Sequence, residues 1–323
     1  MTGQYQGAVR YLGPAALSAA SLVLLLATDR SLPLPGGRVA EVQPVAATAS
    51  QGKRSPAPPR TVLPDSARRR SQLPKRSFTG RGFDACTAPP LETMRVWRTT
   101  SPYGAVGIYT SGTQRGCDQP RLTADWVRQV REMGWELVPT HVGLQAPCSS
   151  VRTKPHRIDP ARAVEQGQDE AAEAVSGLRE LGLGEGSPVY LDIEAYAPGD
   201  PVCSQAVVEF TIGWTQALHA AGYHSGFYSS ANSGVADLVG AAQAGAYPLP
   251  DVIWYAHWDG RAVTDGQGAL PEELWVGHQR IHQYRGGGAE TYGGAALNVD
   301  RDQLDGLVAL GAPPAADRRP GRS

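Results

Sequence analysis

Strand-like and helix-like segments alternate along residues 79–312 of this chain. The strand candidates are short apolar or β-branched runs at 80–85, 105–110, 136–141, 189–194, 224–229, 252–258, 277–284 and 297–300. Helical stretches are expected between them, at 122–133, 160–181, 205–221 and 234–244. This alternation predicts an α/β fold, a (β/α)8 TIM-like barrel that is irregular in its last strands. A doubly wound open sheet is the alternative, although no Gly-x-Gly-x-x-Gly motif follows an early strand.

The expected helices carry recognisable end signals. Asp159 and Pro160 stand where an N-cap and a first helical residue are favoured, so the longest helix is expected to begin there. Gly182 and Gly222 follow two of the helical stretches and are expected to end them.

Two carboxylic acids lie two residues apart in the fourth strand candidate. Asp192 and Glu194 belong to the run Pro188-Val-Tyr-Leu-Asp-Ile-Glu194. Strand side chains alternate between two faces, so both acids are expected on one face, roughly 6–7 Å apart along the backbone. Burying two carboxyl groups together is costly, and glycoside hydrolysis is a chemistry that requires such a pair. A buried structural pair is the alternative.

Further acids occur where other strand candidates end. Asp84 ends the first and Asp300 ends the eighth, and these two strands are neighbours in a closed barrel. We therefore expect both acids to meet Asp192 and Glu194 at the C-terminal mouth of the barrel, with at least one pKa raised by crowding. Alternatively, Asp84 caps a turn or helix, and Asp300 caps a terminal helix near 303–310.

Aromatic and amide side chains stand at the same strand ends. A sugar ring has apolar faces and hydroxyl edges, so a glycan site is expected to combine flat aromatic walls with polar partners. His141 ends the third strand and is expected to be a hydrogen-bonded structural histidine. The candidate sugar-binding residues are Tyr228, Trp254, His257, Gln283 and Tyr284, with Tyr255 and Trp258 in the same region.

Four cysteines follow predicted strands, which places them on loops that share one rim of a barrel. Neighbouring loops suggest the pairs Cys86–Cys117 and Cys148–Cys203 among three possible pairings. Disulfides indicate an exported protein. Four free buried thiols are the alternative, and no Cys-x-x-Cys or His/Cys cluster indicates zinc.

The first 78 residues differ in composition from the rest. Residues 1–28 contain an apolar run at 12–27, which predicts a cleaved signal peptide or a retained N-terminal membrane anchor. Residues 29–78 are rich in Pro, Ala and Arg, and they predict a disordered basic tether. Residues 29–81 carry net charge +8, whereas residues 82–312 carry −12. Residues 313–323 are expected to be a disordered tail.

Six short motifs occur on successive strand candidates: Gly82-Phe-Asp84, Leu191-Asp-Ile-Glu194, Gly226-Phe-Tyr228, Ile253-Trp-Tyr-Ala256, His282-Gln-Tyr284 and Asn298-Val-Asp300. Together they resemble the bacterial domain of unknown function 1906, a glycoside-hydrolase-like family of exported actinobacterial proteins. The chain is more distantly similar to the peptidoglycan muramidases of glycoside hydrolase family 25, although their substrate contacts are not matched outside the motifs.

The resemblance implies a role for each matched acid. Glu194 is expected to protonate the leaving glycosidic oxygen, and Asp192 to orient substrate or stabilise positive charge. Asp84 and Asp300 are expected to hold a water molecule or the sugar N-acetyl group. Fold transfers within such a family more safely than activity does.

The leading hypothesis is a secreted or envelope-associated glycosidase that acts on cell-wall polysaccharide, and the alternative is a barrel that binds glycan without cleaving it. A metal-dependent phosphodiesterase ranks last, because no basic residue or histidine pair accompanies the acids at their strand ends. We expect a monomer without cofactor or metal, with membrane tethering only through the N-terminal segment. The acidic domain argues against nucleic acid as a partner.

Overall fold

The computed structural model describes residues 73–266 and 268–311. The chain divides into two units, and all described residues belong to the second, Arg60–Ser323. The expected signal peptide or anchor, the basic segment up to residue 72 and the expected tail lie outside the described residues. Within the described ranges, no helix is both long and apolar enough to cross a membrane.

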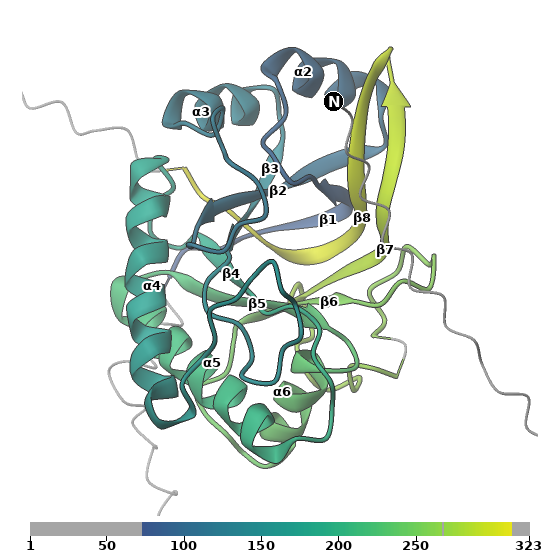
Figure 1. The fold of residues 1–323 in the computed structure, drawn as a ribbon. Coiled ribbons are helices and arrows are strands. Elements are labelled where there is room, and N and C mark those ends of the chain that lie inside the picture. Colours follow the sequence, from purple (N-terminus) through teal and green to yellow (C-terminus); the bar gives the residue numbers. More distant parts are fainter. Residues whose placement is uncertain (1–72, 267, 312–323) are drawn as a thin grey trace, which may run out of the picture. The chain divides into compact units, whose positions relative to one another are not determined.

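Eight strands form a closed barrel in which each strand pairs with its neighbours in sequence, and the first strand pairs with the last (Figure 1). The (β/α)8-like barrel expected from the sequence is therefore confirmed. The elements in chain order are β1 (Arg76–Asp84), α2 (Leu91–Thr100), β2 (Tyr103–Ser111), α3 (Ala124–Glu132), β3 (Glu136–His141), the 3-10 turn η1 (Pro160–Arg162), α4 (Ala163–Glu180), β4 (Pro188–Asp192), α5 (Pro201–Ala221), β5 (His224–Ser230), α6 (Gly234–Gln243), β6 (Val252–Ala256), β7 (Arg280–Tyr292) and β8 (Ala295–Val308).

The last strand breaks the parallel pattern, as the expected irregularity suggested. Strands β1 to β7 are parallel to their neighbours, whereas β8 is antiparallel to both β7 and β1. The terminal helix considered near residues 303–310 is wrong, because this segment is the second half of β8. Leu304, Leu307 and Val308 have helical spacing, but barrel closure gives β8 hydrogen-bonding partners on both edges, and this decides its conformation.

A long hairpin joins β7 to β8 and extends past the barrel wall toward α2 (Figure 1). Its turn is Gly293-Gly294, where both residues have positive φ. The Trp97 ring of α2 meets Tyr292 edge-on at 5.1 Å, and its indole nitrogen donates to the Ala295 carbonyl at 2.9 Å. The sequence analysis did not predict α2, although this helix supports the hairpin.

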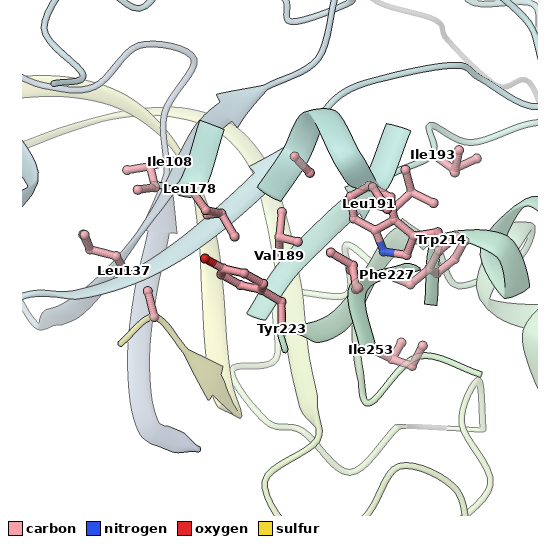
Figure 2. Packing of buried hydrophobic residues seen from close by; sticks show 14 of the residues in the cluster. Ile108, Leu137, Leu178, Val189, Leu191, Ile193, Trp214, Tyr223, Phe227 and Ile253 are labelled. Atoms are coloured by element: carbon pink, nitrogen blue, oxygen red, sulfur yellow. The ribbon is translucent and has the colours of Figure 1, made fainter. Parts of the chain in front are cut away.

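The barrel strands have two different faces, and this separation positions the site. Val189 and Leu191 of β4 point outward into the apolar layer shared with Leu178 of α4 and Trp214 of α5 (Figure 2). Tyr190 alternates with them and joins a second, interior cluster that fills the barrel. Asp192 has the same parity as Tyr190, so the strand directs it into the barrel.

The predicted helix ends are largely reproduced. Asp159 accepts a hydrogen bond from the Ala161 amide at 3.0 Å, although it caps η1, and α4 begins only at Ala163. Gly222 ends α5 in the left-handed conformation with φ of 83°. Here the sequence located the boundary because a residue other than glycine is strained in that conformation.

Both disulfides are formed, with the pairing that neighbouring loops suggested. Cys86–Cys117 joins the loops that follow β1 and β2. Cys148–Cys203 joins the loop between β3 and η1 to the first turn of α5, so Cys203 lies in a helix rather than in a loop. The long β3–η1 loop is thereby fixed above the end of β4.

Candidate functional site

The barrel brings the four sequence-predicted acids to one end of its interior. Asp84 is the last residue of β1, Asp192 is the last residue of β4, and Glu194 follows two residues later. Asp300 lies within β8 rather than at its end, and it is the direct register partner of Asp84. The antiparallel direction of β8 therefore places Asp300 at this rim, for a reason that the sequence analysis did not foresee.

A fifth acid, Asp302, lies one step deeper in the barrel. It pairs in register with Gly82 and is buried. The Trp254 indole donates to its Oδ1 at 2.9 Å. Burial and the charge of Asp84 raise its pKa well above the usual value, which favours the protonated form of Asp302 beside Asp84. Asp302 follows Asp300 by two residues, so both side chains lie on the same face of a strand. This spacing was the sequence signal that could have identified Asp302.

Asp84 is buried and held by two donors. The Tyr109 hydroxyl donates to Oδ1 at 2.8 Å, and the Gln283 amide donates to Oδ2 at 3.0 Å. The pKa of Asp84 is raised to about 7: burial is the largest cause, the charge of Asp300 adds to the rise, and these hydrogen bonds oppose it. Asp84 therefore changes its protonation near neutral pH.

Asp192 and Glu194 differ in their access to solvent. The Asp192 side chain is only 6% exposed and its Oδ1 has no hydrogen-bond partner, whereas the Glu194 side chain is 33% exposed. The pKa of Asp192 is raised to about 7: burial is the largest cause, the charge of Glu194 adds to the rise, and the Lys154 ammonium opposes it. Glu194 is thus the member of the pair that a ligand reaches, and Asp192 lies behind it.

Gln145 fixes the backbone that carries this pair. Its amide nitrogen donates to the Asp192 carbonyl at 2.9 Å, and its Oε1 accepts from the Glu194 amide at 2.8 Å. Gln145 is fully buried. A buried amide that satisfies both backbone groups stabilises the chain where β4 has ended.

Lys154 is a basic site residue that was not expected from the sequence, as Asp302 and Gln145 were not. Its ammonium contacts Glu194 Oε1 and lies 3.4 Å from Asp192 Oδ2. It comes from the β3–η1 loop, far from any strand end, so no periodicity pointed to it. We expected no basic residue to accompany the acids. This is true of the strand ends themselves, but it is wrong for the folded site, because Lys154 reaches the acids from a loop. Its side chain is only 11% exposed.

Asp300 lies between Asp84 and the hairpin. Its carboxylate accepts a hydrogen bond from the Gly287 amide. Burial raises its pKa, and the charge of Glu194 adds to the rise. This electrostatic coupling links β8 to the end of β4 across the barrel mouth.

The predicted sugar-binding residues separate into two groups. Gln283 Oε1 accepts from the Tyr228 hydroxyl at 3.0 Å, so both residues connect to Asp84 through Gln283. Trp254 is buried and supports Asp302. His257 and Tyr284 lie instead beside the His282 ring, each 6.2 Å from its centroid.

Trp258 is the exposed aromatic of this region. Its side chain is 67% exposed, yet its indole nitrogen donates to Gln283 Oε1 at 3.0 Å. A methyl group added at Gly286 would lie 2.3 Å from the indole ring, so the ring rests directly on that glycine. Trp258 is therefore an ordered aromatic surface next to the acids.

The remaining histidines have structural environments. His141 is buried; its Nδ1 lies 2.8 Å from the Ser111 hydroxyl, and its Nε2 contacts Glu170. Two groups have the spacing of metal ligands, His141–Glu170–Glu173 and His257–Asp259–His282. Both nitrogens of His282 face backbone carbonyls, at 2.8 and 2.7 Å, and both nitrogens of His141 are engaged. The His141 group therefore offers no free imidazole nitrogen, whereas in the second group Nδ1 of His257 and Oδ2 of Asp259 are buried without a hydrogen-bond partner.

A family model for the Rv2525c-like, glycoside hydrolase-like domain matches residues 95–304. The chain belongs to this family. The match confirms the resemblance inferred from the motifs, and it spans Lys154, Asp192, Glu194, Asp300 and Asp302.

Solved structures with a similar fold have low sequence identity to this chain. The Mycobacterium tuberculosis Tat-secreted protein Rv2525c is 14% identical, with 72% of this chain and 96% of that chain covered and a TM-score of 0.45. An uncharacterised B. stearothermophilus protein is 20% identical, with 70% of this chain and 99% of that chain covered and a TM-score of 0.44. The modular autolysin LytC from Streptococcus pneumoniae is 14% identical, with 72% of this chain and 47% of that chain covered and a TM-score of 0.45. The search of curated proteins returned no match.

Proposed function

We propose that this protein hydrolyses glycosidic bonds in cell-wall polysaccharide of the peptidoglycan type. The observation that supports it best is the pair at the end of β4, in which a buried Asp192 with a raised pKa lies behind a partly exposed Glu194. Hydrolysis requires a carboxyl group that reaches the leaving oxygen and a second carboxyl group beside the scissile bond. Family membership and the description of a similar structure as an autolysin favour peptidoglycan as the glycan.

Each acid has a role in this proposal. Glu194 protonates the leaving oxygen, because it is the acid that a substrate reaches. Asp192 orients the substrate from behind Glu194. Asp84 and Asp300 lie on adjacent strands and hold the attacking water or the N-acetyl group of the sugar. Tyr228 and Gln283 orient the sugar hydroxyls, with Trp258 as an apolar surface for the ring.

We propose that the protein works outside the cytoplasm. Two disulfides persist in oxidising compartments and are rare in reducing ones. Association with the envelope through the basic N-terminal segment remains an expectation from the sequence.

A barrel that binds glycan without cleaving it is the second candidate, and one observation favours it. Lys154 contacts the Glu194 oxygen that would have to face a glycosidic oxygen. If Lys154 stays there when glycan is bound, Glu194 cannot deliver a proton.

Release of dye from labelled, purified peptidoglycan tests the proposal. Wild-type protein is expected to release dye, and Glu194→Gln to lose about 10²–10⁴-fold of the rate, since a general acid contributes that much. Glu180→Gln, an exposed change at the end of α4, is the matched control and is expected to retain the rate. Pull-down of the same peptidoglycan separates the candidates, because binding without release by wild type would reject hydrolysis and support the binding module.

A further inference from the structure

Lys154 belongs to a loop that is built to hold it in place. The backbones of Gln145 and Arg157 pair in an isolated parallel β-bridge across the base of the β3–η1 loop. Arg157 donates to the carbonyls of Ser149 and Val151, the latter at 2.8 Å, and also to the Lys154 carbonyl. The Cys148–Cys203 disulfide attaches the same loop to α5. The backbone of Lys154 is therefore fixed, and its contact with the acids follows from the fold.

The side chain of Lys154 is nevertheless the part that can move. An ammonium group on a flexible four-carbon chain changes position without rearrangement of its backbone. Its partner Glu194 is the more exposed acid and the one that a glycan reaches first. A sugar that hydrogen-bonds to Glu194 Oε1 competes directly with Lys154 for that oxygen.

We propose that Lys154 forms an ion pair with both Asp192 and Glu194 in the free protein, and that a glycan engaging Glu194 displaces its ammonium group. Because of this displacement, the protein takes up a proton when glycan binds. The inference rests on the proposed function, because it assumes that glycan engages Glu194. In this proposal Lys154 is a positioning residue that acts through Asp192.

Proton uptake follows from the surroundings of Asp192. Asp192 is buried, one of its oxygens lacks a partner, and its ion pair is with Lys154. The charge of Glu194 and of Asp84 raises the pKa of Asp192, and Lys154 lowers it. When the ammonium leaves, Asp192 faces acids and neutral phenols, so it binds a proton. The groups around it are Lys154 from the β3–η1 loop, Glu194 after β4, Asp84 on β1, Tyr109 on β2 and Tyr228 on β5, with Asp300 on β8 acting on Glu194.

The size of the uptake follows from the pKa of about 7 for Asp192. Loss of a cation at this distance raises the pKa of a carboxyl by about 1–3 units. At about pH 7.5, the proton occupancy of Asp192 would then increase from about one quarter to three quarters or more. Binding is therefore expected to take up about half a proton or more per glycan.

Titration calorimetry in buffers of different ionisation enthalpy measures this uptake. The first probe is the tetramer of N-acetylglucosamine, which has no group that titrates near neutral pH, and the second is peptide-free peptidoglycan strands. Wild type and Lys154→Arg are expected to take up the proton. Lys154→Met is expected to bind at least as tightly without uptake, because its Asp192 is already protonated. Lys75→Met, an exposed change just before β1, is the matched control and is expected to behave as wild type.

Each outcome decides the inference. Binding without proton uptake by wild type would overturn it and leave the proposed function intact. Uptake in Lys154→Met equal to that of wild type would also overturn it, whatever the change in affinity, because another group would then be responsible. Failure of both probes to bind would instead reject the proposed function, and the inference with it.

Discussion

The buried acids make a specific prediction about how stability depends on pH. The pKa of Asp84 in the folded protein is about 7, whereas the pKa of an aspartate in the unfolded chain lies near 3.8. Between these two values the folded state binds a proton that the unfolded state has lost, so the free energy of unfolding decreases as pH rises through this range. A difference of about 3 units corresponds to about 4 kcal/mol at most, and coupling to Asp300 and Asp302 shares this amount among the acids.

The perturbation is Asp84→Asn, which removes the titrating group and keeps its approximate shape. Urea denaturation of wild type at pH 5, 6, 7 and 8 is expected to show highest stability at pH 5 and a loss of a few kcal/mol by pH 8. Asp84→Asn is expected to have a shallower slope, whereas Asp169→Asn, an exposed change on α4, is expected to retain the wild-type slope. A wild-type stability that is flat or increases from pH 5 to 8 would refute the assignment of buried acids with raised pKa values.

Three further outcomes are expected. The double change Cys148→Ser with Cys203→Ser is expected to lower the free energy of unfolding by about 4 kcal/mol, because the disulfide closes a loop with a sequence separation of 55 residues. Urea denaturation measures this loss, and a loss under 1 kcal/mol would contradict the prediction. Trp258→Ala is expected to weaken glycan binding about tenfold in calorimetry, and Trp258→Phe to retain most of it, since stacking needs only an aromatic face; equal affinities of all three proteins would exclude stacking. Leu191→Ala is expected to cost about 2–5 kcal/mol of stability, because this fully buried side chain fills the layer between β4 and its covering helices; a stability within 1 kcal/mol of wild type would contradict this packing.

The sequence predicted the barrel well because its strands are short, nearly continuous apolar runs, whose side chains alternate between the two faces of the sheet. The same alternation explains why Asp192 was placed correctly, since Tyr190 and Asp192 share the interior face. The direction of β8 was not predictable in this way. Parity fixes the face of a residue and not the direction of its strand, so Asp300 was expected at a strand end and lies within a longer one.

The side-chain partners of the site were less accessible to sequence reasoning. Lys154 reaches Glu194 because the β3–η1 loop folds back over the end of β4, and loop conformation has no period that a sequence reveals. Trp254 was proposed as a sugar wall, but its strand parity directs it inward to Asp302. Trp258 lies just beyond the end of β6, where alternation no longer determines which way a side chain points.

The antiparallel course of β8 also determines where the barrel is joined to the rest of its chain. Arg76 at the start of β1 pairs with Val308 at the end of β8, at the opposite pole from the paired Asp84 and Asp300. The polypeptide thus enters and leaves through one pole while the carboxylates occupy the other. A linkage made at Arg76 or Val308 would therefore lie at the opposite pole of the barrel from the acidic mouth.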